Sequence, residues 1–115
     1  MPMASIGISL ALSDKEREEL AAAISEIVAH EIGKPEKYVM VRVSRETIVM
    51  SGAQGEAAFV DIRSIGGLSK EVNQRLTAEI SAVLLNSYGI EQQRVYVTCA
   101  DVERTHWGWN GTTFG

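Results

Sequence analysis

The chain contains two copies of one pattern, and the second copy begins 56 positions after the first. Ser13 and Gly33 recur as Ser69 and Gly89. The apolar residues that accompany them recur at the same offset: Leu20 and Leu76, Ile24 and Ile80, Ile27 and Val83, Val28 and Leu84, Val39 and Val95, Val41 and Val97. A pattern with a fixed period indicates one structural unit used twice. We therefore predict a single domain over residues 1–115, with pseudo-repeats at about 2–51 and 58–115.

Each copy is predicted to form a strand, a helix and a second strand. Residues 3–10 alternate apolar with small polar side chains, as expected of a strand with one buried face. Ser13, with Glu16 three positions later, has the pattern of a capping box, so we expect a helix that ends at Gly33. The same reasoning predicts helices over 13–32 and 69–88, strands near 39–43, 58–63 and 95–99, and a short strand or turn near 48–51.

These elements predict an α+β fold. A right-handed crossover in each copy places both helices on one side of a mixed four-stranded sheet of duplicated β-α-β units. The other face would carry Ser5, Gly7, Ser9, Arg42, Asp61, Arg63, Tyr96 and Thr98. Because that face is too polar to be buried within one subunit, we expect it to line a solvated channel in a closed oligomer whose sheet edges pair.

Composition excludes several function classes. The net charge is −4 and the cations are scattered, so we expect no nucleic-acid or membrane partner. A single cysteine, Cys99, and two separated histidines provide no disulfide, metal or cofactor site, and we interpret Cys99 as a small core residue. No apolar run has transmembrane length and no signal peptide is evident. We therefore expect a cytoplasmic protein, secreted only if a leaderless route exists.

The residue after the initiator methionine is a candidate general base. Met1 precedes Pro2, a small residue, so its removal would leave a proline with a free secondary amine. An α-amino group has a pKa of roughly 7.7 to 8.0, which a nearby cation or a dry pocket lowers. A base that titrates near neutral pH is what proton abstraction beside a carbonyl requires.

An ordered set of motifs covers almost the whole chain. They are Pro2-Met3, Gly33-Lys34-Pro35 followed by Tyr38, Ser64-Ile65-Gly66, Arg94-Val95-Tyr96 and the tail from Trp107 to Phe114. In this order the chain resembles the macrophage migration inhibitory factor and D-dopachrome tautomerase family. The resemblance implies a homotrimeric, tautomerase-type barrel without a cofactor, in which an N-terminal proline is the general base and each pocket lies at a subunit boundary.

The resemblance also implies roles for individual residues. Pro2 matches the catalytic base, Lys34 the lysine that meets the substrate carboxylate, and Ile65 the residue whose backbone touches substrate. Tyr96 matches a tyrosine that the adjacent subunit contributes. The other implied substrate-binding positions are Ser64, Tyr38, Thr98, Trp109 and Phe114.

The chain departs from the animal cytokines of this family at three places. Thr98 replaces a ligand-binding asparagine, and Ala57 and Val60 replace the two cysteines of a Cys-x-x-Cys motif. The loop from Leu10 to Leu12 lacks an arginine that forms half of a chemokine-like motif. These departures favour the pocket over receptor mimicry.

We therefore expect an isomerase, a keto-enol tautomerase of small aromatic keto acids such as phenylpyruvate or dopachrome-type compounds. The main alternative is a cytokine-like protein that binds a receptor and keeps a vestigial pocket. Two others are a ferredoxin-like ligand-binding module without catalysis, and decarboxylation or hydration on the same scaffold. The last would need additional charged groups such as Arg42 and Arg63 beside the proline.

Overall fold

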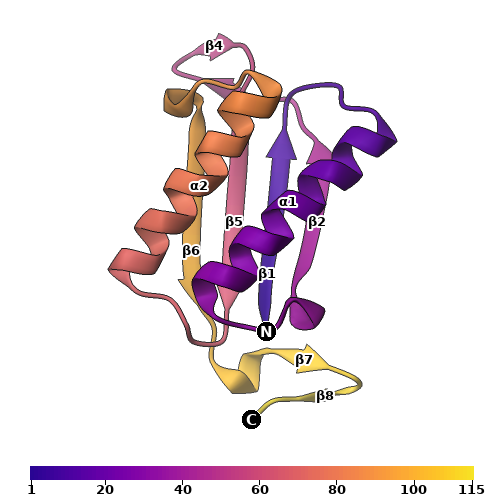
Figure 1. Ribbon diagram of the computed structural model, residues 1–115, viewed down its shortest axis with the longest axis vertical. Helices are drawn as coiled ribbons and strands as arrows, with labels where there is room; N and C mark the ends of the chain where they lie inside the picture. Colours follow the sequence, from indigo (N-terminus) through magenta and orange to yellow (C-terminus); the bar gives the residue numbers. More distant parts are fainter.

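The computed structural model describes residues 1–115 and contains one central sheet with two helices against it (Figure 1). The principal elements are β1 (Pro2–Ile8), α1 (Asp14–Ile32), β2 (Met40–Arg45), β5 (Ala58–Ser64), α2 (Lys70–Tyr88) and β6 (Val95–Asp101). The strand order is β2-β1-β5-β6. The pairs β1/β2 and β5/β6 are parallel, whereas β1 and β5 are antiparallel. The predicted α+β sheet with both helices on one face is confirmed.

The repeat seen in the sequence reappears in the elements. β5 and α2 each begin 56 residues after β1 and α1, at positions 58 and 70 against 2 and 14. Both helices are 19 residues long. A short 3₁₀ turn precedes the second strand of each half, η1 (Glu36–Tyr38) and η2 (Gln92–Arg94). The two halves therefore use the same strand, helix and turn in the same order.

Local interactions define where the helices begin and end. The Glu16 amide donates to the Ser13 hydroxyl at 3.1 Å, and the Ser13 amide donates to the Glu16 carboxylate at 2.9 Å. This capping box satisfies backbone donors that have no partner within the helix, and it lowers the pKa of Glu16. Gly33 and Gly89 end the helices at φ of 76° and 71°, a conformation that glycine adopts without steric cost.

The core lies between the sheet and the helices. On α1 the buried residues follow one another at four-residue intervals, while on β1 and β5 every second residue is buried. Each fully buried Leu, Ile or Val stabilises the fold by about 1.5–3 kcal/mol relative to an exposed position. The fourteen core residues are Ala4, Ile6, Ile8, Leu20, Ile24, Val28, Ile32, Ala58, Val60, Ile62, Leu76, Ile80, Leu84 and Ile90. Of the six predicted apolar pairs, three are only partly buried: Ile27 and Val83, Val39 and Val95, and Val41 and Val97.

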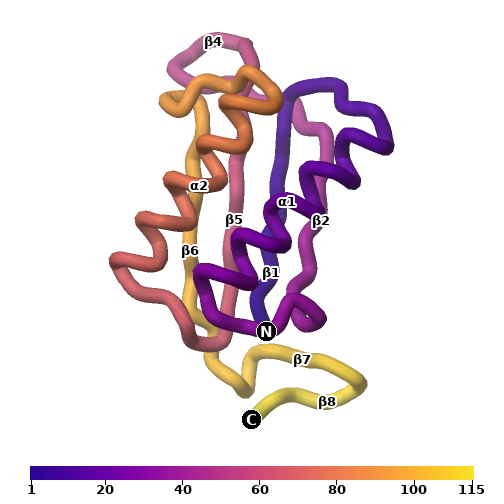
Figure 2. The backbone as a smooth tube through the Cα atoms, viewed as in Figure 1, coloured from indigo at the N-terminus to yellow at the C-terminus, as the bar shows by residue number.

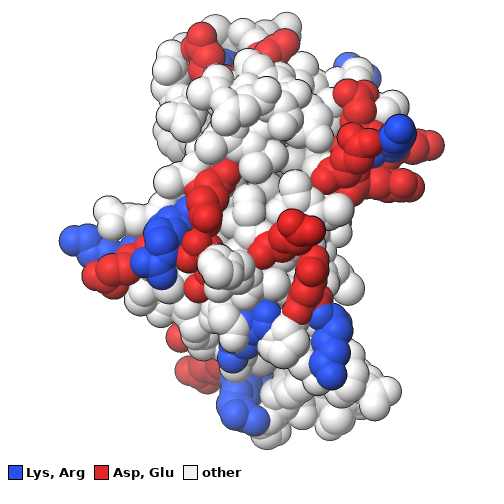
Figure 3. Space-filling view, viewed as in Figure 1, with Lys and Arg blue, Asp and Glu red and all other residues white.

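The opposite face of the sheet is open and polar, as predicted. Arg42 Nε donates to Ser5 Oγ at 2.8 Å, across the β2–β1 pair. On the same face, Asp61 of β5 accepts from Thr98 Oγ1 of β6 at 2.9 Å and from Arg63 Nε of its own strand at 3.2 Å. These contacts satisfy polar groups on neighbouring strands without burying them. Figure 3 shows the helical side, where acidic and basic groups are interspersed.

Two short hairpins extend from this sheet. β3 (Val49–Met50) pairs with β4 (Ala53–Gln54), which confirms the short strand or turn expected near 48–51. Arg94 holds this hairpin through backbone carbonyls, with Nε donating to Glu56 at 2.9 Å and the two Nη groups to Met50 and Ala53 at 3.3 Å. β7 (Gly108–Trp109) pairs with β8 (Thr112–Thr113) near the C-terminus.

Small differences from the predicted boundaries have local causes. β1 begins at Pro2 and ends at Ile8, because the chain bends at Ser9 and Leu10. The Ser9 hydroxyl accepts from the Ala57 amide at 2.8 Å and so stabilises that bend. No helix is both long and apolar enough to cross a membrane.

Candidate active site

Four of the predicted site residues lie around the start of β1. Pro2 is buried and pairs with Ser64 across the β1–β5 ladder. The Ile65 amide donates to the Met1 carbonyl at 3.4 Å. Burial, and after it the positive charge of Lys34, lowers the pKa of the Met1 amino group. The amino end of the chain therefore lies between a cation and a backbone N–H donor.

Lys34 reaches this place because of how α1 ends. The amides of Gly33 and Lys34 both donate to the Ala29 carbonyl, at 3.0 and 3.1 Å. Gly67, from the loop after β5, packs against the same end of the helix, where an added Cβ would lie 2.6 Å from Ile32 Cγ2. A side chain at position 67 would therefore push this loop away from α1.

The Ser64 side chain has a different place from the one expected of a substrate contact. Ser64 is fully buried, and its hydroxyl donates to the Gly66 carbonyl at 2.7 Å. The Gly66 amide in turn donates to Asp101 Oδ1 at 2.9 Å. None of the sequence motifs contains Asp101. Its position became evident only from the β5–β6 register, which pairs it with Ser64.

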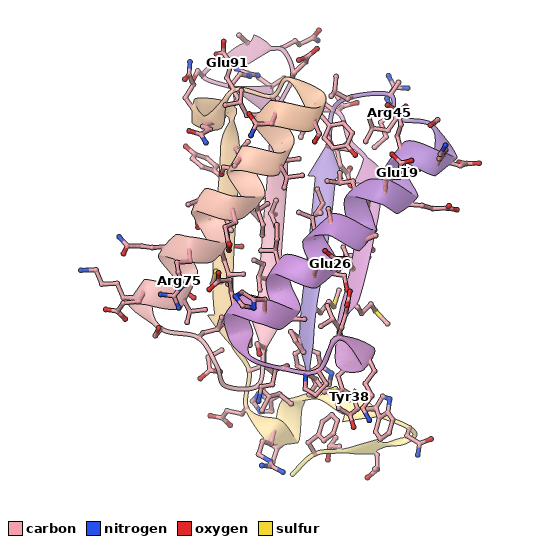
Figure 4. All side chains as sticks on the ribbon, viewed as in Figure 1. Glu19, Glu26, Tyr38, Arg45, Arg75 and Glu91 are labelled. Atoms are coloured by element: carbon pink, nitrogen blue, oxygen red, sulfur yellow. The ribbon has the colours of Figure 1, made fainter.

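Three aromatic side chains lie at the same end of the molecule. Figures 1 and 2 show the amino terminus, the end of α1, the η1 turn and the β7–β8 hairpin together at the bottom of the view. Tyr38, labelled in Figure 4, projects toward that hairpin. Trp109 stacks on Phe114 with ring centroids 6.1 Å apart and 8° between the planes. Trp109 remains 54% exposed, so its ring is available to contact another group.

Two predicted site residues lie elsewhere in the subunit. Tyr96 pairs with Phe59, which pairs with Gly7, five residues along β1 from Pro2. At ~3.3 Å per residue, this separation along the strands is about 16 Å. Thr98 lies near the middle of the open face, where its hydroxyl is bonded to Asp61. Tyr96 is 65% exposed. The structure therefore does not bring these two residues to Pro2 of the same chain.

None of the five principal hollows of a single subunit is lined by Pro2, Lys34 or Ile65. The largest, of about 600 Å³, lies at the opposite end of the sheet among Ser9, Arg45, Glu46, Thr47, Ile48, Gln54, Gly55 and Glu56. Only one of these side chains is apolar, which is a poor match for an aromatic ligand. The candidate site is therefore defined by the chemistry around Pro2 and not by the shape of one subunit.

Comparison with known proteins identifies the family. The sequence profile described as "Macrophage migration inhibitory factor (MIF)" matches residues 1–115. The chain belongs to this family. A macrophage migration inhibitory factor homolog of Trichuris trichiura is 33% identical over 91 residues, covering 78% of this chain and 80% of the relative. This membership confirms the resemblance found in the sequence and places the chain in the tautomerase superfamily.

Solved structures of the MIF family have the same fold. The crystal structure of a macrophage migration inhibitory factor-like protein from Entamoeba histolytica matches with a TM-score of 0.94 and 29% identity, covering 98% of each chain. A macrophage migration inhibitory factor homologue from Prochlorococcus marinus matches with a TM-score of 0.92 and 31% identity, covering 98% of this chain and 99% of that one. The whole chain, including both hairpins, therefore follows the MIF architecture.

The structure also places Cys99 and the two arginines Arg42 and Arg63. Cys99 packs partly buried against the core, and burial followed by the charge of Asp61 raises the pKa of its thiol. Arg42 and Arg63 both lie on the open face of the sheet, opposite the buried side on which the Pro2 ring packs.

Proposed function

We propose that this protein is a keto-enol tautomerase of small aromatic keto acids, of which phenylpyruvate and dopachrome-type compounds are representative, and that Pro2 is its general base. One observation carries the proposal. The Ile65 amide donates to the Met1 carbonyl at 3.4 Å, and burial and the positive charge of Lys34 lower the pKa of the Met1 amine. Once Met1 is removed, the prolyl nitrogen becomes an amine at this place and the Ile65 amide is free to bind another acceptor.

The chemistry follows from these groups. The substrate carboxylate would contact Lys34 Nζ and the Ile65 N–H, which are a charged and a neutral donor. Neutral Pro2 then takes a proton from the carbon beside the carbonyl, the C–H electron pair becomes the enol double bond, and the C=O π pair moves to the oxygen. The protonated prolyl amine gives its proton to that oxygen, so the base is regenerated. The burial and the Lys34 charge that lower the pKa of the Met1 amine would keep the prolyl nitrogen unprotonated near neutral pH.

We also propose that the site is completed by a second subunit in a homotrimer. β2 and β6 are sheet edges, and Tyr96 and Phe59 are 65% and 45% exposed on the open face. Because Tyr96 lies at the far end of its own sheet from Pro2, it can serve the pocket only from a neighbouring chain. Thr98 would come from the same neighbour, and Tyr38, Trp109 and Phe114 would form the aromatic wall.

The test uses a matched pair of chains. Intact mass first establishes that Met1 is absent from the purified protein. An alanine inserted between Met1 and Pro2 then leaves every side chain in place but acylates the prolyl nitrogen. We expect phenylpyruvate tautomerisation in the natural chain and a loss of most activity in the extended one. Equal activity in both chains would show that the prolyl nitrogen is not the base.

Receptor binding with a vestigial pocket is the alternative that this pair of chains also distinguishes. It requires a surface but no free prolyl amine. The segment that would carry the chemokine-like motif is not a free loop, because Leu10 and Leu12 pack partly buried against the core. An inactive natural chain with an intact, Met1-free terminus would favour that alternative.

A further inference from the structure

The two peptide groups that flank Ile65 are both held by the end of β6. A peptide group is planar, so the Ile65 N–H and the Ser64 carbonyl share one plane, and the Gly66 N–H lies in the next. The Val102 amide donates to the Ser64 carbonyl at 2.9 Å, which orients the first plane. Asp101 Oδ1 accepts from the Gly66 amide at 2.9 Å, which orients the second.

This loop would otherwise be free to turn. Gly66 and Gly67 have φ of 74° and 80°, and glycine loses more conformational entropy on ordering than any other residue. Only the Ser64 hydroxyl, which donates to the Gly66 carbonyl at 2.7 Å, offers a second side-chain tether. The direction of the Ile65 N–H therefore depends on contacts made by its neighbours.

We infer that Asp101 is a positioning residue: by holding the Ile65–Gly66 peptide it limits the rotation of the glycine loop, and it so helps the Val102 contact to keep the Ile65 amide directed at the substrate carboxylate, an inference that rests on the proposed function. Asp101 is not itself placed on the reacting atoms. It pairs with Ser64, which pairs with Pro2, so a whole strand separates it from the base. Its negative charge alone would repel a carboxylate bound at Ile65. The hydrogen bond of Asp101 therefore favours carboxylate binding, whereas its negative charge opposes it.

The two effects have opposite signs, and paired variants separate them. Asp101→Asn retains the Oδ1 acceptor and removes the charge, so carboxylates should bind as well as in the natural protein or more tightly. Asp101→Ala removes both, and we expect about three- to tenfold weaker binding, the scale of one hydrogen bond. Asp101→Glu keeps the charge but displaces the acceptor oxygen, so this variant should also bind carboxylates more weakly. If the alanine variant does not fold, the glutamate variant tests the inference in its place.

Phenylacetate is the probe, because it has a ring and a carboxylate but no keto group to enolise. Its binding is followed by NMR at the Ile65 amide, and kcat and KM are measured with phenylpyruvate. The positioning role predicts a higher KM with a smaller change in kcat for Asp101→Ala, and recovery in Asp101→Asn. Glu103→Ala is the control, since Glu103 is an exposed acid of the same segment that makes no contact with Gly66.

Each outcome decides the question. If Asp101→Ala binds phenylacetate as tightly as the natural protein, or more tightly, only the charge matters and the inference is wrong. The inference also fails if the natural protein does not bind phenylacetate at Ile65. If the variants bind as expected but the natural protein has no tautomerase activity, the positioning role stands and the proposed reaction does not.

Discussion

Replacement of Lys34 by methionine should alter both substrate affinity and the pH dependence of tautomerisation. Methionine removes the charge but retains an unbranched apolar side chain. The end of α1 should survive the change, because it depends on the backbone amides of Gly33 and Lys34, which both bond to the Ala29 carbonyl. A loss of activity can then be attributed to the missing ammonium group.

The size of each effect follows from the structure. A hydrogen bond between charged groups contributes about 1.5–3 kcal/mol, so kcat/KM for phenylpyruvate should fall roughly ten- to a hundredfold. Lys34 also lowers the pKa of the Met1 amine. We expect the same effect on the prolyl amine once Met1 is removed, so loss of Lys34 should raise that pKa and move the activity profile to higher pH. Burial is the larger cause of the lowered pKa, so the shift should be partial and leave the pKa below that of an ordinary amino terminus.

The assay is the pH profile of kcat/KM with phenylpyruvate and with its methyl ester, which lacks the carboxylate charge. The ester should lose less activity than the acid. Lys15→Met is the control, because Lys15 is 85% exposed in its side chain and contacts only Glu19, at 3.9 Å. An unchanged pH profile, together with equal losses for acid and ester, would refute this reasoning. Lys34 would then be merely a cation at a helix C-terminus.

Three further predictions concern the wall, the assembly and the helix pair. Trp109→Ala should raise KM for aromatic keto acids about three- to tenfold, the scale of one aromatic contact, and leave the pH profile in place; a shifted profile would contradict a purely apolar role. Light scattering at micromolar concentration should give the mass of a trimer, and a monomer would contradict a pocket shared between Pro2 and Tyr96 of different chains. Burial, and then the neighbouring Glu31 carboxyl, raises the pKa of Glu79, so its stabilising contribution is complete at acid pH and is lost as the pH rises through the raised value. Glu79→Gln should therefore increase Tm near neutral pH and have little effect near pH ~3, below the unfolded pKa of roughly 4.3, where the carboxyl is almost fully protonated in both states; an equal change at both values would exclude this ionisation as the cause.

Much of the fold could be predicted because its determinants are local. The capping box of Ser13 and Glu16 and the terminating Gly33 depend on residues a few positions apart. Alternating burial along β1 needs only the period of the strand. The 56-residue repeat then supplied the second half from the first, and the polar residues of the open face followed from the same alternation.

The candidate site was less accessible, because it depends on which residues become neighbours across strands. Motifs could name Pro2, Lys34 and Ile65, but not that Met1 would bridge the latter two groups. Ser64 was expected among the substrate-binding positions, and the structure adds that its hydroxyl is buried and bonded to the loop that follows it. No local pattern marks Asp101, since its partner Gly66 is 35 residues away in the chain.

By itself, the sequence determined the duplicated unit, the helix ends and the two faces of the sheet, because periodicity and capping act over single turns and neighbouring residues. Only the tertiary structure decided which end of the sheet holds each side chain. The antiparallel β1–β5 pair places Ser64 beside Pro2, and the parallel β5–β6 pair then places Asp101 beside Ser64 and Tyr96 far away. Strand direction and register are set by long-range packing, which no short segment of the chain encodes.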